Sequence, residues 1–157
     1  MKVKLLVIGK TDKDYLQEGI DLFQKRIPHY LPFDYQIIPD IKNTRNLPED
    51  QQKEKEGELI LAQLKTGDEL ILLDERGKEY RSTEFAGFLE KKMVGGTKCL
   101  VFCIGGPYGF SAKVYETAVG KISLSKMTFS HQMVRLIFCE QLYRALTILK
   151  GEPYHHE

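Results

Sequence analysis

The residues best suited to chemistry lie in three segments of the last third of the chain. A glycine turn, residues 105–109, follows an apolar run, and a segment rich in hydroxyl groups, residues 124–129, comes next. A long apolar helix then leads to a tail with Tyr154, His155 and His156. Glycine lets a backbone approach a ligand closely, hydroxyl groups form hydrogen bonds, and imidazole titrates near neutral pH. Because a packed core does not require such crowding, the functional site is expected here.

Each segment also has an ordinary structural interpretation. The glycines at 105, 106 and 109 fit neither the dinucleotide fingerprint nor the P-loop, so these two classes of site lose their main support and a plain tight turn is the alternative. The tail is open to interpretation as a frayed terminus. Its two adjacent histidines lack the further ligands at familiar spacing that a zinc site needs, so no metal is expected.

Two arginines of the final helix have open roles. Arg144 lies four residues after Glu140, so an ion pair between them is the conservative interpretation. The alternative is that the planar guanidinium of Arg144 binds a phosphate. His131 and Arg135 are also four residues apart and are expected to share a helix face. Spacing alone does not decide between these roles.

Apolar runs of strand length alternate with helical patterns, which predicts an α/β fold with a mostly parallel sheet flanked by helices. The predicted strands are residues 3–8, 33–38, 70–73, 100–104 and 122–124. Residues 33–38 alternate apolar with polar side chains, as an edge strand does. Since 157 residues suffice for one core and fall short of two, we expect a single domain, residues 1–157.

Start signals predict four helices before the last one. Residues 11–14 resemble a capping box, Pro48 fits the first turn of the second helix, and Ser82 and Ser111 fit the N-caps of the third and fourth. The charged stretch up to Glu58 is interpreted as the solvated face of the second helix.

The final helix, residues 131–150, leaves no wide polar face, so it must be covered on more than one side. One sheet cannot easily do that in so small a domain. We therefore expect this helix to pack on the sheet and on a second subunit, in an isologous dimer.

Composition narrows the classes of function. With 23 basic and 22 acidic residues the net charge is +1, so any nucleic-acid interpretation must rest on motifs rather than on the overall field. The three cysteines form no C-x-x-C pair and lie in apolar runs, which favours reduced, buried thiols. No stretch of about 18 uncharged apolar residues and no signal-peptide core is present, so a soluble, cytoplasmic protein without a membrane segment is expected.

Three strand ends are expected to form one pocket. Ligands of parallel α/β sheets bind beyond the carboxyl ends of the strands. The pairs Leu73-Asp74, Ile104-Gly105 and Leu124-Ser125 each stand at such an end. Backbone groups there would hydrogen-bond a flat heterocycle, while apolar side chains would cover its faces.

Taken in order, these segments resemble the bacterial 23S ribosomal RNA pseudouridine N3-methyltransferases, a short single-domain branch of the SPOUT superfamily. The likeness runs the whole length of the chain, and its motifs are highly specific when taken together. It is carried by residues 2–10, 72–74, 104–109, 124–129, 134–136, 140–145 and 153–155.

The resemblance implies an S-adenosylmethionine-dependent enzyme whose C-terminal part is tied in a deep trefoil knot, with the knot and the cofactor site within roughly residues 70–157. It implies a homodimer whose substrate is a pseudouridine in the large-subunit RNA of the assembled ribosome. The residues that match the family's cofactor-binding positions are Leu73, Gly105, Leu124, Ser125, Lys126, Met127, Thr128 and Phe129.

For the reaction, the resemblance points to the tail. Tyr154 and His155 are expected to face the base, with His155 removing the imide proton or positioning the base. Arg144 is expected to contact RNA phosphate or to organise the tail. The chain departs from the family at two places: His156 stands where a permanent cation is common, which puts phosphate binding there in doubt, and Ser130 stands where proline is common.

Two other classes of function remain open at this point. One is a non-catalytic RNA-binding module that associates with the ribosome and keeps the same fold. The other is an α/β enzyme with a mononucleotide cofactor, which the absent phosphate-loop spacings disfavour.

Overall fold

The computed structural model describes residues 1–42 and 44–156. Its sheet has five parallel strands in the order β2-β1-β4-β3-β5. The strands are β1 (Lys2–Ile8), β2 (Phe33–Ile38), β3 (Glu69–Glu79), β4 (Cys99–Ile104) and β5 (Gly120–Ser123). The predicted parallel α/β fold is therefore confirmed, and β2 is an edge strand as its alternating pattern indicated.

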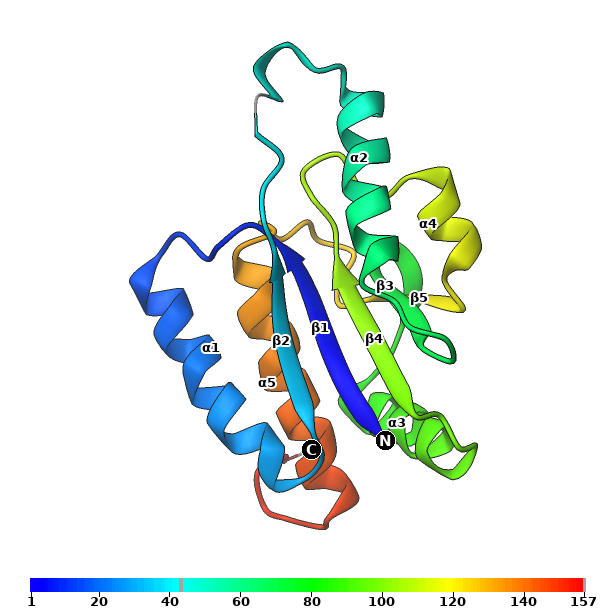
Figure 1. The fold of residues 1–157 in the computed structure, drawn as a ribbon. Helices are drawn as coiled ribbons and strands as arrows, with labels where there is room; N and C mark the ends of the chain where they lie inside the picture. Colours follow the sequence, from blue (N-terminus) through cyan, green and yellow to red (C-terminus); the bar gives the residue numbers. More distant parts are fainter. Residues whose placement is uncertain (43, 157) are drawn as a thin grey trace.

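Helices cover both faces of the sheet (Figure 1). The helices are α1 (Asp14–Arg26), α2 (Glu49–Ala62), α3 (Ser82–Val94), α4 (Ala112–Thr117) and α5 (Met133–Leu149), with short 3-10 turns η1 (Ile27–His29) and η2 (Thr44–Asn46). Side chains of β1 alternate between two cores: Leu5 packs with α1, α3 and α5, and Leu6 packs with α2 and α4. Burial on both faces explains why the central strands are continuously apolar.

Helix α5 lies between α1 and α3 on one face of the sheet. Its side chains Phe138, Cys139, Leu142 and Ala145 are fully buried in that core. The lack of a wide polar face thus has an explanation within one chain, because the sheet and two helices cover α5. The burial of α5 therefore does not by itself require a second subunit, and the dimer stays a prediction.

The helix starts differ in part from the predicted ones. Helix α1 begins at Asp14 after Lys13, which makes no side-chain cap, so the predicted capping box at residues 11–14 is wrong. Helix α3 begins at Ser82 itself, and the Glu84 carboxylate caps it by accepting the Arg81 N–H at 2.7 Å. The Ser111 cap is confirmed, since its Oγ accepts the N–H of Val114 at 3.3 Å.

Helix α2 begins directly after Pro48 and is only partly a solvated face. Glu54 and Glu58 are exposed, as predicted for the charged stretch, but Glu56 between them is only 4% exposed. The prediction fails at Glu56 because this residue faces the core side of the helix with Gly57 and Ile60. No ion pair to Glu56 is present in the described part of the chain.

The three cysteines are free thiols, as predicted. Cys103 and Cys139 are buried, and burial raises the pKa of the Cys139 thiol to about 12, so it stays protonated at neutral pH. Cys99 is half-buried. Across residues 1–42 and 44–156, no helix combines the length and the apolar character that crossing a membrane requires.

Candidate functional site

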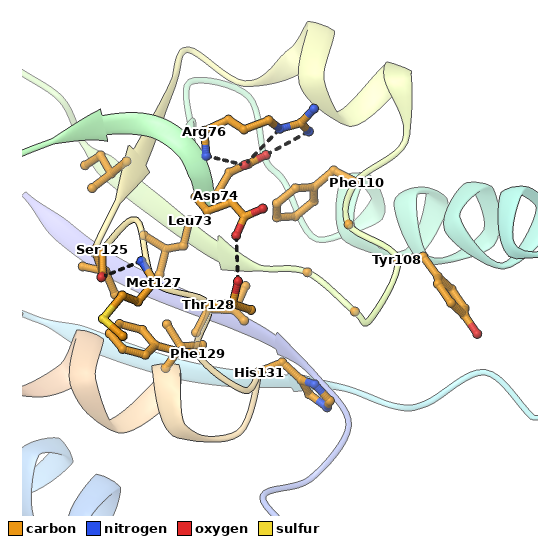
Figure 2. A pocket seen from close by; sticks show the side chains of 18 of the residues that line it. Leu73, Asp74, Arg76, Tyr108, Phe110, Ser125, Met127, Thr128, Phe129 and His131 are labelled. Carbon is orange, nitrogen blue, oxygen red and sulfur yellow. Dashed lines mark hydrogen bonds and ion pairs between the residues drawn. The ribbon is translucent and has the colours of Figure 1, made fainter.

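A cavity of about 490 Å³ opens beyond the carboxyl ends of β4 and β5 and beside residues 73–76 of β3, where the pairing of β3 with β5 shifts register (Figure 2). This is the edge of the sheet where the sequence predicted a pocket, but the predicted strand end at Leu73-Asp74 is wrong, because β3 continues to Glu79. The lining combines the middle of β3, the glycine turn after β4, the loop after β5 and the turn before α5. The lining residues are Leu73, Asp74, Glu75, Arg76, Ile104, Gly105, Gly106, Tyr108, Gly109, Phe110, Tyr115, Ile122, Leu124, Ser125, Met127, Thr128, Phe129, His131 and Val134.

Seven of the eight predicted cofactor residues line this cavity. They come from segments about fifty residues apart in sequence, which the parallel sheet brings to one edge. The exception is Lys126, whose side chain is 86% exposed and whose ammonium lies 3.7 Å from the Glu79 carboxylate. Lys126 therefore faces solvent, while its neighbours Ser125 and Met127 face the cavity.

The glycine turn presents bare backbone to the cavity. A Cβ at Gly105 would meet the Phe110 ring at 3.1 Å, and one at Gly106 would meet the Glu56 carboxylate oxygens at 2.6 Å. Gly109 has a φ of 81°, in the left-handed region, and its N–H donates to the Gly106 carbonyl at 3.2 Å to close the turn. A side chain at Gly105 or Gly106 would displace a neighbour and one at Gly109 would be strained, and without side chains a ligand can approach this main chain directly.

The loop after β5 is held by its own hydroxyl groups. Ser125 Oγ accepts the Met127 N–H at 2.9 Å, and Ser123 Oγ donates to the Ser125 carbonyl at 2.9 Å. Thr128 Oγ1 donates to the Glu75 carboxylate at 3.1 Å, which joins this loop to β3 (Figure 2). The loop is thereby ordered around the mouth while Met127 stays 77% exposed.

A charged group that the sequence did not single out lies inside the cavity. The side chain of Asp74 is 8% exposed and accepts hydrogen bonds from the Tyr115 hydroxyl and from the backbone and side chain of Arg76 (Figure 2). Burial alone would raise the pKa of Asp74, but these hydrogen bonds and the guanidinium charge outweigh it and lower the pKa. The cavity therefore contains a carboxylate that is ionised at neutral pH.

Arg135 of α5 is structural, and His131, which was expected on the same helix face, lies in the turn before α5. Arg135 is 1% exposed and donates to the carbonyls of Ile8 and Gly9 at 2.7 and 2.8 Å and to that of His131 at 3.1 Å. It thus ties the start of α5 to the loop after β1. His131 itself lines the cavity, so Arg135 fixes one of its walls.

The predicted catalytic residues form a cluster at the other end of α5. Arg144 donates to the Glu140 carboxylate at 2.6 Å, as the conservative interpretation predicted, and its Nη1 lies 3.2 Å from His155 Nδ1. Its guanidinium lies 4.8 Å from the centre of the Tyr154 ring, whose hydroxyl donates to Glu140 at 3.1 Å. Glu152 accepts the Tyr30 hydroxyl at 2.6 Å. The tail is therefore held against the protein rather than frayed; Glu157 lies outside the described residues.

Burial raises the pKa of Tyr154, and the neighbouring Glu140 charge and its hydrogen bond raise it further. The phenol accordingly stays protonated at neutral pH and acts as a donor rather than a base.

The cluster and the cavity lie at opposite ends of the molecule. Helix α5 has 17 residues and so spans about 25 Å at the usual rise of an α-helix. It runs from the carboxyl ends of the strands to the end where both termini lie (Figure 1). One chain therefore does not bring Tyr154, His155 or Arg144 to the cavity. Among the described residues, no group of three metal-ligating side chains is present.

Comparison with known proteins agrees with this geometry. Residues 1–155 match the family model described as predicted SPOUT methyltransferase. Proteins named ribosomal RNA large subunit methyltransferase H from Parabacteroides distasonis, Flavobacterium johnsoniae and Bacteroides fragilis are 64%, 62% and 59% identical to this chain. Each comparison covers the whole of both chains. The chain therefore belongs to the SPOUT methyltransferase family.

Proposed function

We propose that the protein transfers a methyl group from S-adenosylmethionine to N3 of a pseudouridine in the 23S RNA of the assembled ribosome. The family and the names of its full-length relatives support RNA methylation. The observation that carries the proposal is the cavity at the carboxyl edge of the sheet, which is lined by seven of the eight residues expected to bind the cofactor.

The residues present suit this cofactor. A cavity of about 490 Å³ lies within the range of ordinary small-molecule sites. The apolar side chains of Leu73, Leu124 and Ile122 suit the faces of an adenine, and backbone groups around the cavity suit its hydrogen-bonding edge. The carboxylate of Asp74 suits a ligand with positive charge. When bound, S-adenosylmethionine supplies an electrophilic methyl group on a sulfonium.

We propose further that the protein acts as a homodimer, because one chain separates its cavity from its tail by the length of α5. A second copy packed against α5 in an isologous arrangement would bring its tail to the cavity of the first. Two equivalent composite sites would result. This separation is stronger support for the dimer than the apolar character of α5, which the sheet and two helices already cover.

In the composite site, His155 accepts the imide proton of N3 or positions the base, and Tyr154 offers its ring to the base. Arg144 contacts both of these side chains, so we assign it to organising the tail in preference to gripping a phosphate. The orientation of the base and the removal of one proton are then the contributions of the tail. Because the substrate is part of the ribosome, we place the enzyme in the cytoplasm.

The test is methyl transfer to ribosomes from cells that lack the enzyme, using His155→Ala and Arg144→Ala with cofactor binding measured in parallel. Turnover is expected to fall by more than about tenfold while cofactor affinity stays within about twofold, because neither residue touches the cavity of its own chain. Turnover within about threefold of wild type would refute these roles. Calorimetry that detects no saturable binding of S-adenosylmethionine to the wild type would instead favour the non-catalytic RNA-binding module.

A further inference from the structure

A buried carboxylate lies against the glycine turn that forms one wall of the cavity. Glu56 of α2 is 4% exposed, and both of its carboxylate oxygens lie 2.6 Å from where a Cβ would stand on Gly106. Gly106 lines the cavity and Glu56 does not, so the carboxylate stands directly behind the turn. Only the main chain of the turn at Gly106 then lies between the carboxylate and a ligand in the cavity.

The packing of α2 fixes the carboxylate in this place. A Cβ at Gly57 would meet Ser111 Oγ at 2.5 Å, so the helix lies against the start of α4 with no room to spare. Ser111 is itself buried and caps α4. The backbone of α2 is therefore held close to the turn, and the Glu56 side chain starts from a fixed position beside Gly106.

No positively charged side chain of the described residues compensates the charge of Glu56. Its Oε1 atom is buried and has no hydrogen-bond partner among the described residues. Burial raises its pKa, a hydrogen bond with Gln52 lowers it, and the Asp40 carboxylate raises it again. A carboxylate buried in this way costs stability, and such groups commonly mark a functional constraint.

We propose that Glu56 is a specificity-determining residue that makes the cavity prefer the positively charged methyl donor over its neutral product. The inference rests on the proposed function. S-adenosylmethionine carries a sulfonium cation, whereas S-adenosylhomocysteine has a neutral thioether and is otherwise the same molecule. A negative charge in a low-dielectric setting behind the turn favours the cationic form, because protein interiors screen charges much less than water does. Glu56 thereby promotes exchange of product for substrate.

A purely structural role for Glu56 predicts a different outcome. Glutamine has the same shape as glutamate and no charge, and replacing a buried unpaired charge by a neutral group tends to preserve or raise stability. If the side chain only supported the turn, Glu56→Gln would affect the two ligands equally. The ratio of the two affinities therefore separates an electrostatic role from a supporting one.

The experiment is calorimetric titration of wild type, Glu56→Gln and Glu56→Asp with each ligand at neutral pH, alongside thermal unfolding. Glu58→Gln is the matched control, because it makes the same change at an exposed position of the same helix. Glu56→Gln is expected to weaken the binding of S-adenosylmethionine by about fivefold or more and the binding of S-adenosylhomocysteine by less than about twofold. Its melting temperature should equal or exceed that of the wild type. Glu56→Asp, which keeps the charge, should retain most of the preference.

Equal weakening of both ligands by Glu56→Gln, or no change in either, would overturn the inference while leaving the proposed function intact. If Glu56→Gln does not fold, loss of the preference in Glu56→Asp would overturn it as well, because that variant is still charged. A wild type that binds neither ligand would overturn both the inference and the proposed function.

Discussion

Arg135 offers the sharpest test of how the cavity wall is held. Substituting methionine for this fully buried arginine removes the donors to three backbone carbonyls, those of Ile8, Gly9 and His131. Each unsatisfied buried acceptor costs about 1 to 3 kcal/mol. Removal of the buried charge offsets part of this, so Arg135→Met is expected to lower the free energy of unfolding by roughly 3 to 5 kcal/mol. That is a large share of the stability of a domain this size.

Urea unfolding at neutral pH measures the effect, with Arg45→Met as a control at an exposed position. The control should change the free energy of unfolding by less than about 0.5 kcal/mol. Since Arg135 also fixes His131, the folded fraction of Arg135→Met should bind S-adenosylmethionine more weakly than wild type. A loss of stability below about 1 kcal/mol, with unchanged cofactor affinity, would refute the assignment of Arg135 as the anchor of this wall.

Two further predictions concern the cavity. Gly106→Ala should reduce affinity for S-adenosylmethionine by about tenfold or more in calorimetry, because its Cβ would meet the buried Glu56 carboxylate at 2.6 Å and either that side chain or the turn must shift; unchanged affinity would mean that Glu56 makes room and the turn stays in place. Asp74→Asn should lower the free energy of unfolding at pH 7 by about 1 kcal/mol. The pKa of Asp74 is lower in the folded than in the unfolded state, so its ionised form stabilises the fold at any pH above the unfolded-state pKa of about 3.9. That contribution is lost as pH falls through the folded pKa, so unfolding curves of variant and wild type should converge in acid; a constant difference at every pH would contradict this.

The sequence predicted what depends on local pattern. Continuous apolar runs marked the buried strands, because both faces of β1 and β4 are covered, and the alternating run at residues 33–38 marked the edge. The Ser111 cap was also predicted, since its hydroxyl contacts an N–H only three residues away. The sequence also located the glycine turn and the ends of β4 and β5 beside the cavity, but it ended the third strand at Leu73, whereas β3 continues to Glu79.

Features that depend on packing between distant segments escaped prediction. The partner of Asp74 is Tyr115, 41 residues later, and nothing in the spacing connects them. Glu56 looked like one more charge on a solvated face, because its burial depends on how α2 meets the glycine turn. The expected capping box at residues 11–14 failed because Thr11 Oγ1 accepts a hydrogen bond from Arg135 at 3.2 Å instead of capping α1.

The proposal that two chains complete one site is most directly tested with a heterodimer of two defective subunits. One subunit carries Gly106→Val, whose branched side chain would meet the buried Glu56 carboxylate and is expected to distort the turn, and the other carries His155→Ala. Each homodimer should be inactive. A heterodimer purified through two different tags would contain one site with an intact cavity and an intact tail, so its methyl transfer to ribosomes should reach about half that of wild type. A heterodimer no more active than either parent would contradict the composite site.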